Sequence, residues 1–163
     1  MTDLITTKIL SGKEVAESVY DRMDESIISL SSQGVVPGLA AVLMGSDPAS
    51  EVYVRMKTKR FSKLKLHSET FYMPADLKEH DIADVISKLN ENPKYHGILV
   101  QLPLPKHIDT EKILNAVSPE KDVDGFHPEN LGRLASGKPR FIPCTPKGIL
   151  EILKHYDIST QGK

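Results

Sequence analysis

Tyr53 and Lys57 stand four positions apart in a segment that favours a helix. Asp47 and Pro48 precede them, and a capping carboxylate followed by proline at the first helical position is a typical helix start. Ser50, Tyr53 and Lys57 are then spaced by three and four residues, so they share one face of the helix. A phenol one turn away from an amine can orient a flat polar ligand and move a proton.

A basic run on the same helix offers a simpler interpretation of Lys57. Six positive residues and no negative residue fall between Arg55 and Lys65. Lysines on helices are commonly solvated, so this face could be exposed to solvent without any role in binding or catalysis. The run could also meet an anionic ligand tail or a phosphate. The helix by itself leaves these alternatives open.

Gln101 is an amide at the end of an apolar run, directly before Leu102-Pro103-Leu104-Pro105. A buried amide without hydrogen-bond partners costs about 1–3 kcal/mol, so its partners must be identified. One interpretation is that the side chain bonds to loop backbone at the end of a sheet. The other is that its carbonyl oxygen holds a lysine amine or a ligand in place.

Asp122 and Asp124 flank a valine in the segment from Lys121 to His127. At most one of the two carboxylates is expected to face a pocket. Gly125 permits a tight turn and a close ligand approach. A carboxylate offers paired acceptors in one plane, which suits the N–H groups of a heterocycle. Neither a calcium-loop spacing nor a His/Cys set is present, so no metal site is predicted.

Cys144 is the only cysteine, and it precedes a predicted helix. A helix N-terminus can lower the pKa of a thiol, so a nucleophile is conceivable, although no histidine stands near it in a recognisable arrangement. A single cysteine excludes an intrachain disulfide framework and suits a reducing compartment.

The composition is that of a soluble globular protein. The chain has 163 residues, 39% hydrophobic and 26% charged, with a net charge of −1. This length fits one domain with a real core, and this charge gives no global attraction to nucleic acid or anionic membranes. The N-terminal segment does not resemble a signal peptide, and no segment approaches the roughly 20 apolar residues of a membrane span. We therefore predict a cytoplasmic protein without nucleic-acid or membrane partners.

Apolar periodicity and turn signals divide the chain into alternating helices and strands. The predicted helices cover residues 11–33, 47–65, 78–92, 109–117 and 145–156; the predicted strands cover residues 39–44, 67–73 and 97–102; a Gly- and Pro-rich loop covers residues 118–143. Ser11 and Glu14 match a capping box. The alternation predicts an α/β domain in three layers, with a mostly parallel sheet flanked by helices. Because ligands bind at the carboxyl ends of such strands, Tyr53, Lys57 and Gln101 are expected to converge there.

Four sequence motifs in register resemble the bifunctional methylenetetrahydrofolate dehydrogenase/methenyltetrahydrofolate cyclohydrolase family. They are Tyr53-x-x-x-Lys57, Gly97-Ile-Leu-Val-Gln-Leu-Pro-Leu-Pro105, Lys121-Asp-Val-Asp-Gly-Phe-His127 and Pro143-Cys-Thr-Pro-Lys-Gly148. The resemblance extends from about Leu10 to Gly162.

The resemblance implies roles for the candidate residues. Lys57 would be the catalytic group, Tyr53 would stack on or orient the folate, and Gln101 would bond to the lysine. Asp124 would hold the pterin ring, and Ser50 would lie near the same cleft. The implied dehydrogenase passes a hydride from 5,10-methylenetetrahydrofolate to NADP, and the implied cyclohydrolase adds water to give 10-formyltetrahydrofolate. A lysine can act as a base near pH 7 only where its surroundings disfavour the ammonium.

The same resemblance implies a domain division. Family members continue into a Rossmann unit that carries the nicotinamide cofactor, and the chain contains no G-x-G-x-x-G. We therefore expect residues 1–160 to form the folate-binding catalytic domain, residues 161–163 to begin the cofactor domain, and no cofactor-binding residue in this chain. These residues would then lack the dehydrogenase step, and the full-length protein would be a homodimer.

Two other interpretations remain. The first is the substrate domain of another two-domain dehydrogenase, such as a shikimate dehydrogenase-like protein, which also pairs a lysine with an aspartate. The second is a non-catalytic module that binds folate or a partner protein. The segment from Val100 to Pro105 disfavours the first. The joint presence of Tyr53, Lys57, Gln101 and Asp124 disfavours the second, because decay of a site usually removes the chemical residue.

Overall fold

The computed structural model describes residues 7–162. Its elements are α1 (Gly12–Ser32), β1 (Gly38–Met44), α2 (Pro48–Lys63), β2 (His67–Met73), α3 (Glu79–Glu91), β3 (Gly97–Val100), α4 (Thr110–Ala116), α5 (Pro128–Ala135) and α6 (Cys144–His155). Residues 1–6 and Lys163 lie outside the described residues. Lys163 is the last of the three residues that were predicted to begin the cofactor domain.

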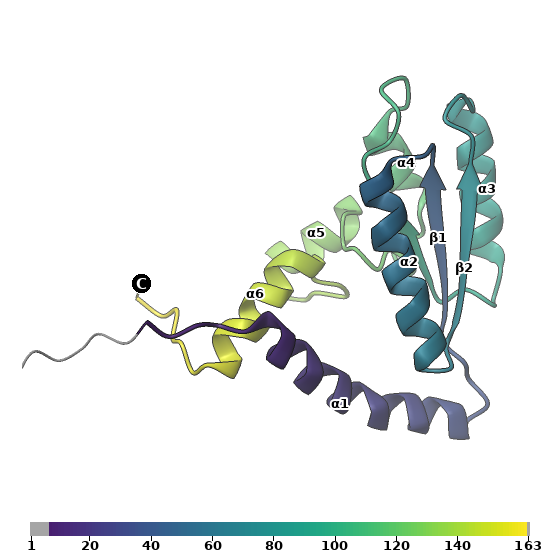
Figure 1. The fold of residues 1–163 in the computed structure, drawn as a ribbon. Coiled ribbons are helices and arrows are strands. Elements are labelled where there is room, and N and C mark those ends of the chain that lie inside the picture. The colour runs from purple at the N-terminus through teal and green to yellow at the C-terminus, as the bar shows by residue number, and fades with distance from the viewer. Residues whose placement is uncertain (1–6, 163) are drawn as a thin grey trace, which may run out of the picture.

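The three strands form one parallel sheet in the order β2-β1-β3 (Figure 1). β1 is central, and it aligns Met44 with Met73 of β2 and Val42 with Val100 of β3. The carboxyl ends of the strands therefore meet at one edge of the sheet. The turn that leads into α2 and the loop that follows β3 both leave from this edge, as the sequence predicted.

The two faces of the sheet are covered by different helices, which gives the predicted three layers (Figure 1). Alternate residues of β1 point to opposite faces. Ala40, Val42 and Met44 pack in one core with residues of α3 and α4, including the fully buried Ile82 and Ile113. On the other face, Leu39, Ala41 and Leu43 pack with Val54 of α2. The continuous apolar run of β1 is explained by burial on both faces.

Local capping signals set two of the helix starts that the sequence predicted. The Asp47 side chain accepts the backbone N–H of Ser50 at 2.8 Å, with Pro48 at the first helical position of α2. At α1, Ser11 accepts the N–H of Glu14 at 3.4 Å, which is half of the predicted capping box. The other half is replaced, because the Ser11 N–H donates instead to the hydroxyl of Tyr156 at 2.8 Å.

Two predictions of secondary structure are wrong: one helix was missed, and one strand is shorter than predicted. The predicted loop over residues 118–143 contains α5, which starts with Pro128 at its first position and is capped by the His127 side chain, which accepts the N–H of Glu129. Its Gly132 and flanking prolines gave the segment the composition of a loop. β3 ends at Val100 rather than at Leu102, although the backbone N–H of Gln101 still donates to Val42 on β1 at 2.9 Å.

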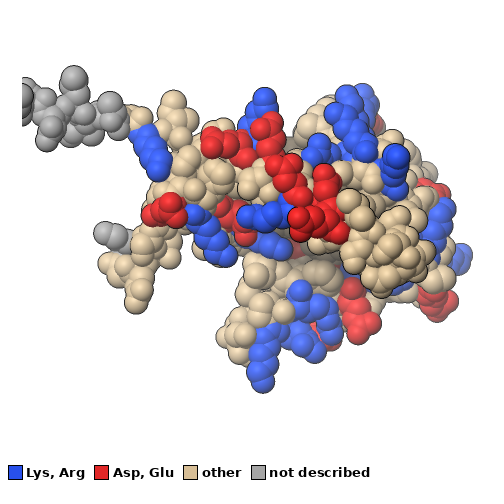
Figure 2. Space-filling model, turned by 90° about the horizontal axis from the view of Figure 1, so that it is seen from below, with Lys and Arg blue, Asp and Glu red and all other residues tan. Residues whose placement is uncertain are grey.

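α1 and α6 lie beside one another, away from the sheet (Figure 1). Two polar contacts join this part of the chain: Arg22 pairs with Glu151 at 2.8 Å, and the Tyr156 hydroxyl donates to Glu14 at 3.1 Å. Lys and Arg side chains are interspersed with Asp and Glu on the face in Figure 2, which agrees with the near-zero net charge. Within residues 7–162, no helix combines the length and the apolar character that a membrane span requires.

Candidate active site

A pocket of about 320 Å³ lies at the carboxyl edge of the sheet and brings together three of the predicted site residues. Lys57 reaches it from α2, Gln101 directly follows β3, and Asp124 comes from the loop after α4. Phe126 and Cys144 also line the pocket. The pocket therefore combines an amine, an amide and a carboxylate with an aromatic ring, a set that can hold a flat polar ligand.

The other two predicted residues of α2 do not line this pocket. Ser50 is only 3% exposed, and its hydroxyl donates to the carbonyl of Leu102 at 3.3 Å, at the start of the loop that forms the pocket wall. Tyr53 is 56% exposed. The helix thus places Lys57 in the pocket, buries Ser50 and leaves the Tyr53 phenol accessible to a ligand larger than the pocket.

The Gln101 side chain bonds to loop backbone, which is the simpler of its two interpretations. Its amide nitrogen donates to the Leu102 carbonyl at 2.9 Å, the same oxygen that accepts the Ser50 hydroxyl. In the described part of the chain, no hydrogen bond joins Gln101 to Lys57, so the bond implied by the family resemblance stays a prediction. The Gln101 amide oxygen has no partner within residues 7–162 and can accept a hydrogen bond from a ligand or an amine.

Asp122 and Asp124 face different surroundings, because the chain turns between them: the N–H of Gly125 donates to the Asp122 carbonyl at 3.2 Å. Asp124 lines the pocket, whereas Asp122 is only 6% exposed and is bonded to its own loop. The Asp122 carboxylate accepts the N–H of Gly125 at 3.1 Å and that of His127 at 2.8 Å. Asp122 therefore shapes the turn, and Asp124 is the carboxylate available to a ligand.

The pocket changes the acidity of two of its groups. Burial raises the pKa of Asp124; the charge of Lys57 and the Cys144 thiol work against this rise, and the charge of Asp122 adds to it. Burial and the Asp124 carboxylate also raise the pKa of Cys144. Its sulfur lies 3.7 Å from Asp124 Oδ1 and 3.6 Å from the carbonyl of Val123. A raised thiol pKa disfavours the thiolate, so Cys144 does not suit the role of a nucleophile.

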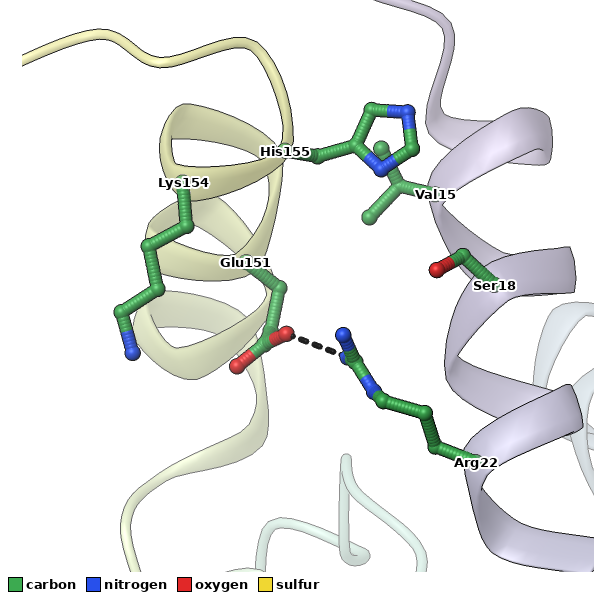
Figure 3. A pocket seen from close by; sticks show the side chains of 6 residues that line it. All are labelled: Val15, Ser18, Arg22, Glu151, Lys154 and His155. Carbon is green, nitrogen blue, oxygen red and sulfur yellow. Dashed lines mark hydrogen bonds and ion pairs between the residues drawn. The ribbon is translucent and has the colours of Figure 1, made fainter.

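A second pocket among the described residues lacks this combination of groups. A pocket of about 380 Å³ between α1 and α6 is lined by Val15, Ser18, Arg22, Glu151, Lys154 and His155 (Figure 3). Its Arg22 and Glu151 pair with each other, so their charges are satisfied within the protein. Within residues 7–162, no group of three or more His, Cys, Asp or Glu side chains is placed to hold a metal ion.

Sequence reasoning missed part of the pocket and its support. Phe126 and Pro143 line the pocket, and Asn130 of α5 lies fully buried behind Asp122. The motifs that contain Phe126 and Pro143 are visible in the sequence, but nothing in their spacing indicates which side chains meet. Asn130 carries no local signal, because its partner Asp122 is eight residues away across a turn.

Comparisons with known proteins identify a family. The sequence model described as "Tetrahydrofolate dehydrogenase/cyclohydrolase, catalytic domain" matches residues 10–124. The bifunctional protein FolD of Geotalea uraniireducens is 52% identical over 156 residues, which are 96% of this chain and 56% of that protein. FolD of Enterococcus faecalis is 46% identical over 155 residues, 95% of this chain and 55% of its own length. The chain thus spans about half the length of the curated relatives it matches.

Solved structures agree with this match. The crystal structure of the bifunctional FolD enzyme of Campylobacter jejuni has a TM-score of 0.93 and 38% identity, covering 97% of this chain and 56% of that chain. The Trypanosoma brucei enzyme, solved with NADP cofactor and inhibitor, has a TM-score of 0.91 and 31% identity, covering 96% of this chain and 54% of that chain. Motif order, fold and these matches agree: the chain belongs to the tetrahydrofolate dehydrogenase/cyclohydrolase family.

Proposed function

We propose that the pocket of Lys57, Gln101 and Asp124 binds a tetrahydrofolate and supports cyclohydrolase chemistry. The observation that carries this proposal is the meeting of an amine, an amide and a carboxylate in one pocket. In this proposal Asp124 accepts N–H groups of the pterin ring, and Tyr53 orients the part of the folate outside the pocket. Gln101 and the buried Ser50 hold the Leu102 backbone, and Gln101 also offers its amide oxygen to the ligand or to Lys57.

The proposed reaction is hydrolysis of 5,10-methenyltetrahydrofolate. A water molecule adds to the methenyl carbon, and the Lys57 amine takes the proton that this water releases. The bond from that carbon to N5 then breaks as the new hydroxyl gives up its proton and becomes the formyl C=O, and N5 takes up a proton. The products are 10-formyltetrahydrofolate and the one proton that the Lys57 amine accepted. This step needs only the bound folate, water and a proton acceptor, all of which the pocket can bring together.

NADP is the expected hydride acceptor for the dehydrogenase reaction, as in the Trypanosoma brucei structure. The described residues do not fit a dinucleotide. Pyrophosphate binds at a helix N-terminus that follows a Gly-rich turn. At the turn from β1 to α2 the Asp47 carboxylate already occupies that position and would repel a phosphate. We therefore derive no step through NADP, and we propose that residues 7–162 carry the cyclohydrolase step without hydride transfer.

Several family properties stay predictions for this chain. They are the homodimer, the cytoplasmic location and the catalytic domain boundary near residue 160. The net charge of −1 supports the prediction that nucleic acid and anionic membranes are not partners.

Replacing Lys57 with Met tests the proposed reaction. We expect Lys57→Met to lower cyclohydrolase turnover of methenyltetrahydrofolate by about 100- to 10,000-fold, because the proton acceptor is lost. The matched control is Lys59→Met, an exposed lysine on the same helix that does not line the pocket. It should keep the parent rate, and circular dichroism should show that both variants fold.

The results also separate the alternatives. Near-parent turnover by Lys57→Met would contradict the role of this lysine. Folate binding without turnover by the parent chain would instead favour the non-catalytic folate-binding module. Binding of a different substrate class by the same pocket would favour another two-domain dehydrogenase.

A further inference from the structure

A buried hydrogen-bonded pair lies behind the candidate pocket. Asn130 of α5 is 0% exposed, and its amide nitrogen donates to Asp122 Oδ2 at 2.9 Å and to the carbonyl of Pro119 at 2.8 Å. Its amide oxygen accepts from the Arg140 guanidinium at 3.3 Å. All the polar groups of this asparagine are therefore engaged, and its position is closely fixed.

The same pair closes the turn that contains Asp124. Asp122 accepts from the N–H groups of Gly125 and His127, which lie on the far side of Asp124 in the chain. Gly125 has a φ of +71°, a left-handed conformation that this turn requires. Asp124 thus stands inside a turn whose two ends are joined through one buried carboxylate.

The loop before the turn is anchored separately to the sheet. The Lys121 carbonyl accepts the N–H of Ile98 on β3 at 2.7 Å. The Lys121 amine donates to the carbonyls of Leu89 and Asn92 at the end of α3, at 3.1 and 2.9 Å. The far end of the turn, at Gly125 and His127, is held by the Asp122 carboxylate, which also accepts a hydrogen bond from Asn130.

We propose that Asp122 and Asn130 are positioning residues, whose buried pair fixes the turn of residues 122–127 and so sets where the Asp124 carboxylate lies in the pocket. This inference rests on the proposed function, because it assigns a supporting pair to the same folate site. Neither residue is expected to touch the ligand, since both are buried and neither lines the pocket.

The pair also acts on Asp124 through charge. The charged or titratable groups around Asp124 are Lys57 from α2, Asp122 from the same loop and the Cys144 thiol from α6. The Asp122 charge raises the pKa of Asp124, and this effect depends on Asp122 staying ionised. Hydrogen bonds from Asn130 and two backbone N–H groups hold this carboxylate in place.

The test compares three variants of the 163-residue chain by calorimetric titration with a folate analogue between pH 5 and pH 9. We expect Asn130→Ala to weaken binding by about tenfold or more, because the turn loses its fixed end. Asp122→Asn removes the charge and turns one of the two accepting oxygens into a donor. The turn should therefore loosen, the pKa of Asp124 should fall, and the acidic limb of the binding profile should move to lower pH.

Asn90→Ala is the matched control. Asn90 also donates to one backbone carbonyl, that of Ala116 at 2.8 Å, and accepts the Ser118 N–H at 2.8 Å. It lies at the end of α3, before β3 begins, and therefore at the opposite end of that strand from Gln101. We expect it to lose stability in urea unfolding while keeping the affinity and pH profile of the parent.

A second readout does not depend on ligand binding. The carboxyl titration of Asp124, followed by NMR in the ligand-free chain, should change in Asn130→Ala and Asp122→Asn and stay unchanged in Asn90→Ala. An unchanged Asp124 titration in the first two variants, or an affinity loss in Asn130→Ala no greater than in Asn90→Ala, would overturn the proposal. If the parent chain does not bind the analogue, the proposed function fails, and the Asp124 titration alone decides whether the pair positions this carboxylate.

Discussion

At the scale of single residues, Lys57 and Asp124 face one pocket from different segments and affect each other through their charges. Burial raises the pKa of Asp124, and the positive charge of Lys57 opposes that rise. In the proposed function, the Asp124 carboxylate accepts N–H groups of a flat heterocycle, and the Lys57 amine takes the proton of a reacting water. The two residues therefore have different roles in this proposal: Asp124 remains a hydrogen-bond acceptor, and Lys57 takes up a proton.

The raised pKa of Asp124 predicts how stability depends on pH. The folded chain holds the Asp124 proton more tightly than the unfolded chain does. The contribution of Asp124 to the free energy of unfolding therefore falls as pH rises from 3.8, the ordinary pKa of aspartate, through the higher pKa of Asp124 in the folded chain. Asp124→Asn removes this dependence. In urea unfolding at several pH values, the variant should therefore gain free energy of unfolding relative to the parent as pH rises, up to a plateau above the folded pKa.

The difference between parent and variant isolates Asp124, since all other titrating groups are common to both chains. A difference that falls as pH rises, or that does not change with pH, would show that the pKa of Asp124 is not raised in the folded chain. A loss of folate-analogue binding should accompany the substitution at every pH, because the amide cannot replace the paired acceptors of the carboxylate.

At the scale of elements, the pocket depends on how the turn of residues 122–127 meets the start of α6. Gly125 has a φ of +71°, and a Cβ on this residue would lie 3.1 Å from the nitrogen of Pro143, in the pocket wall. Gly137 has a φ of +75° with no atom within 4 Å of such a Cβ. The two glycines share a backbone conformation and differ in their neighbours.

This contrast predicts different outcomes for two alanine substitutions. Each should lower the free energy of unfolding by about 1–2 kcal/mol, because alanine disfavours the left-handed conformation. Gly125→Ala should in addition push the turn away from Pro143 and weaken folate-analogue binding, while Gly137→Ala should leave binding unchanged. Urea unfolding and calorimetry of both variants measure the two effects; equal affinities would contradict the close contact between the turn and α6.

Elements with strong local signals could be predicted from the sequence. The apolar run of β1 and the Asp47 cap depend on neighbouring residues, and the structure confirms the fold class that follows from them. α5 could not be predicted, because it is short and its proline and glycine resemble loop residues. The pair of Asp122 and Asn130 could not be predicted either, since it forms only when a turn brings two distant positions together.

The candidate site was predictable in part for the same reason. The spacing of Lys57 and its place after a strand end indicated the correct edge of the sheet, and the loop after β3 supplied Gln101. Tyr53 shares the predicted helix face with Lys57, yet its side chain is 56% exposed and does not line the pocket. Which residues of a helix face reach a pocket depends on packing, which the spacing alone does not contain.

At the scale of the whole molecule, a three-layer sheet domain carries the pocket, and α1 and α6 extend beside it (Figure 1). α6 begins with Cys144 in the pocket wall and ends near the start of α1, where Tyr156 and Glu14 interact. The Arg60 guanidinium of α2 lies 3.3 Å from the ring centre of Tyr20 on α1. These contacts connect α2 and α6, which both contribute residues to the pocket, with α1 near the N-terminal end of the described chain.

The most direct test of the central claim is calorimetric titration of the 163-residue chain and its Asp124→Ala variant with a folate analogue. We predict binding by the parent chain and a loss of at least about tenfold in affinity for the variant, because the acceptors for the pterin N–H groups are removed. Lys59→Met serves as the surface control and should bind like the parent. A parent chain that is folded by circular dichroism and does not bind, or a variant that binds equally well, would contradict the claim that this pocket holds the folate.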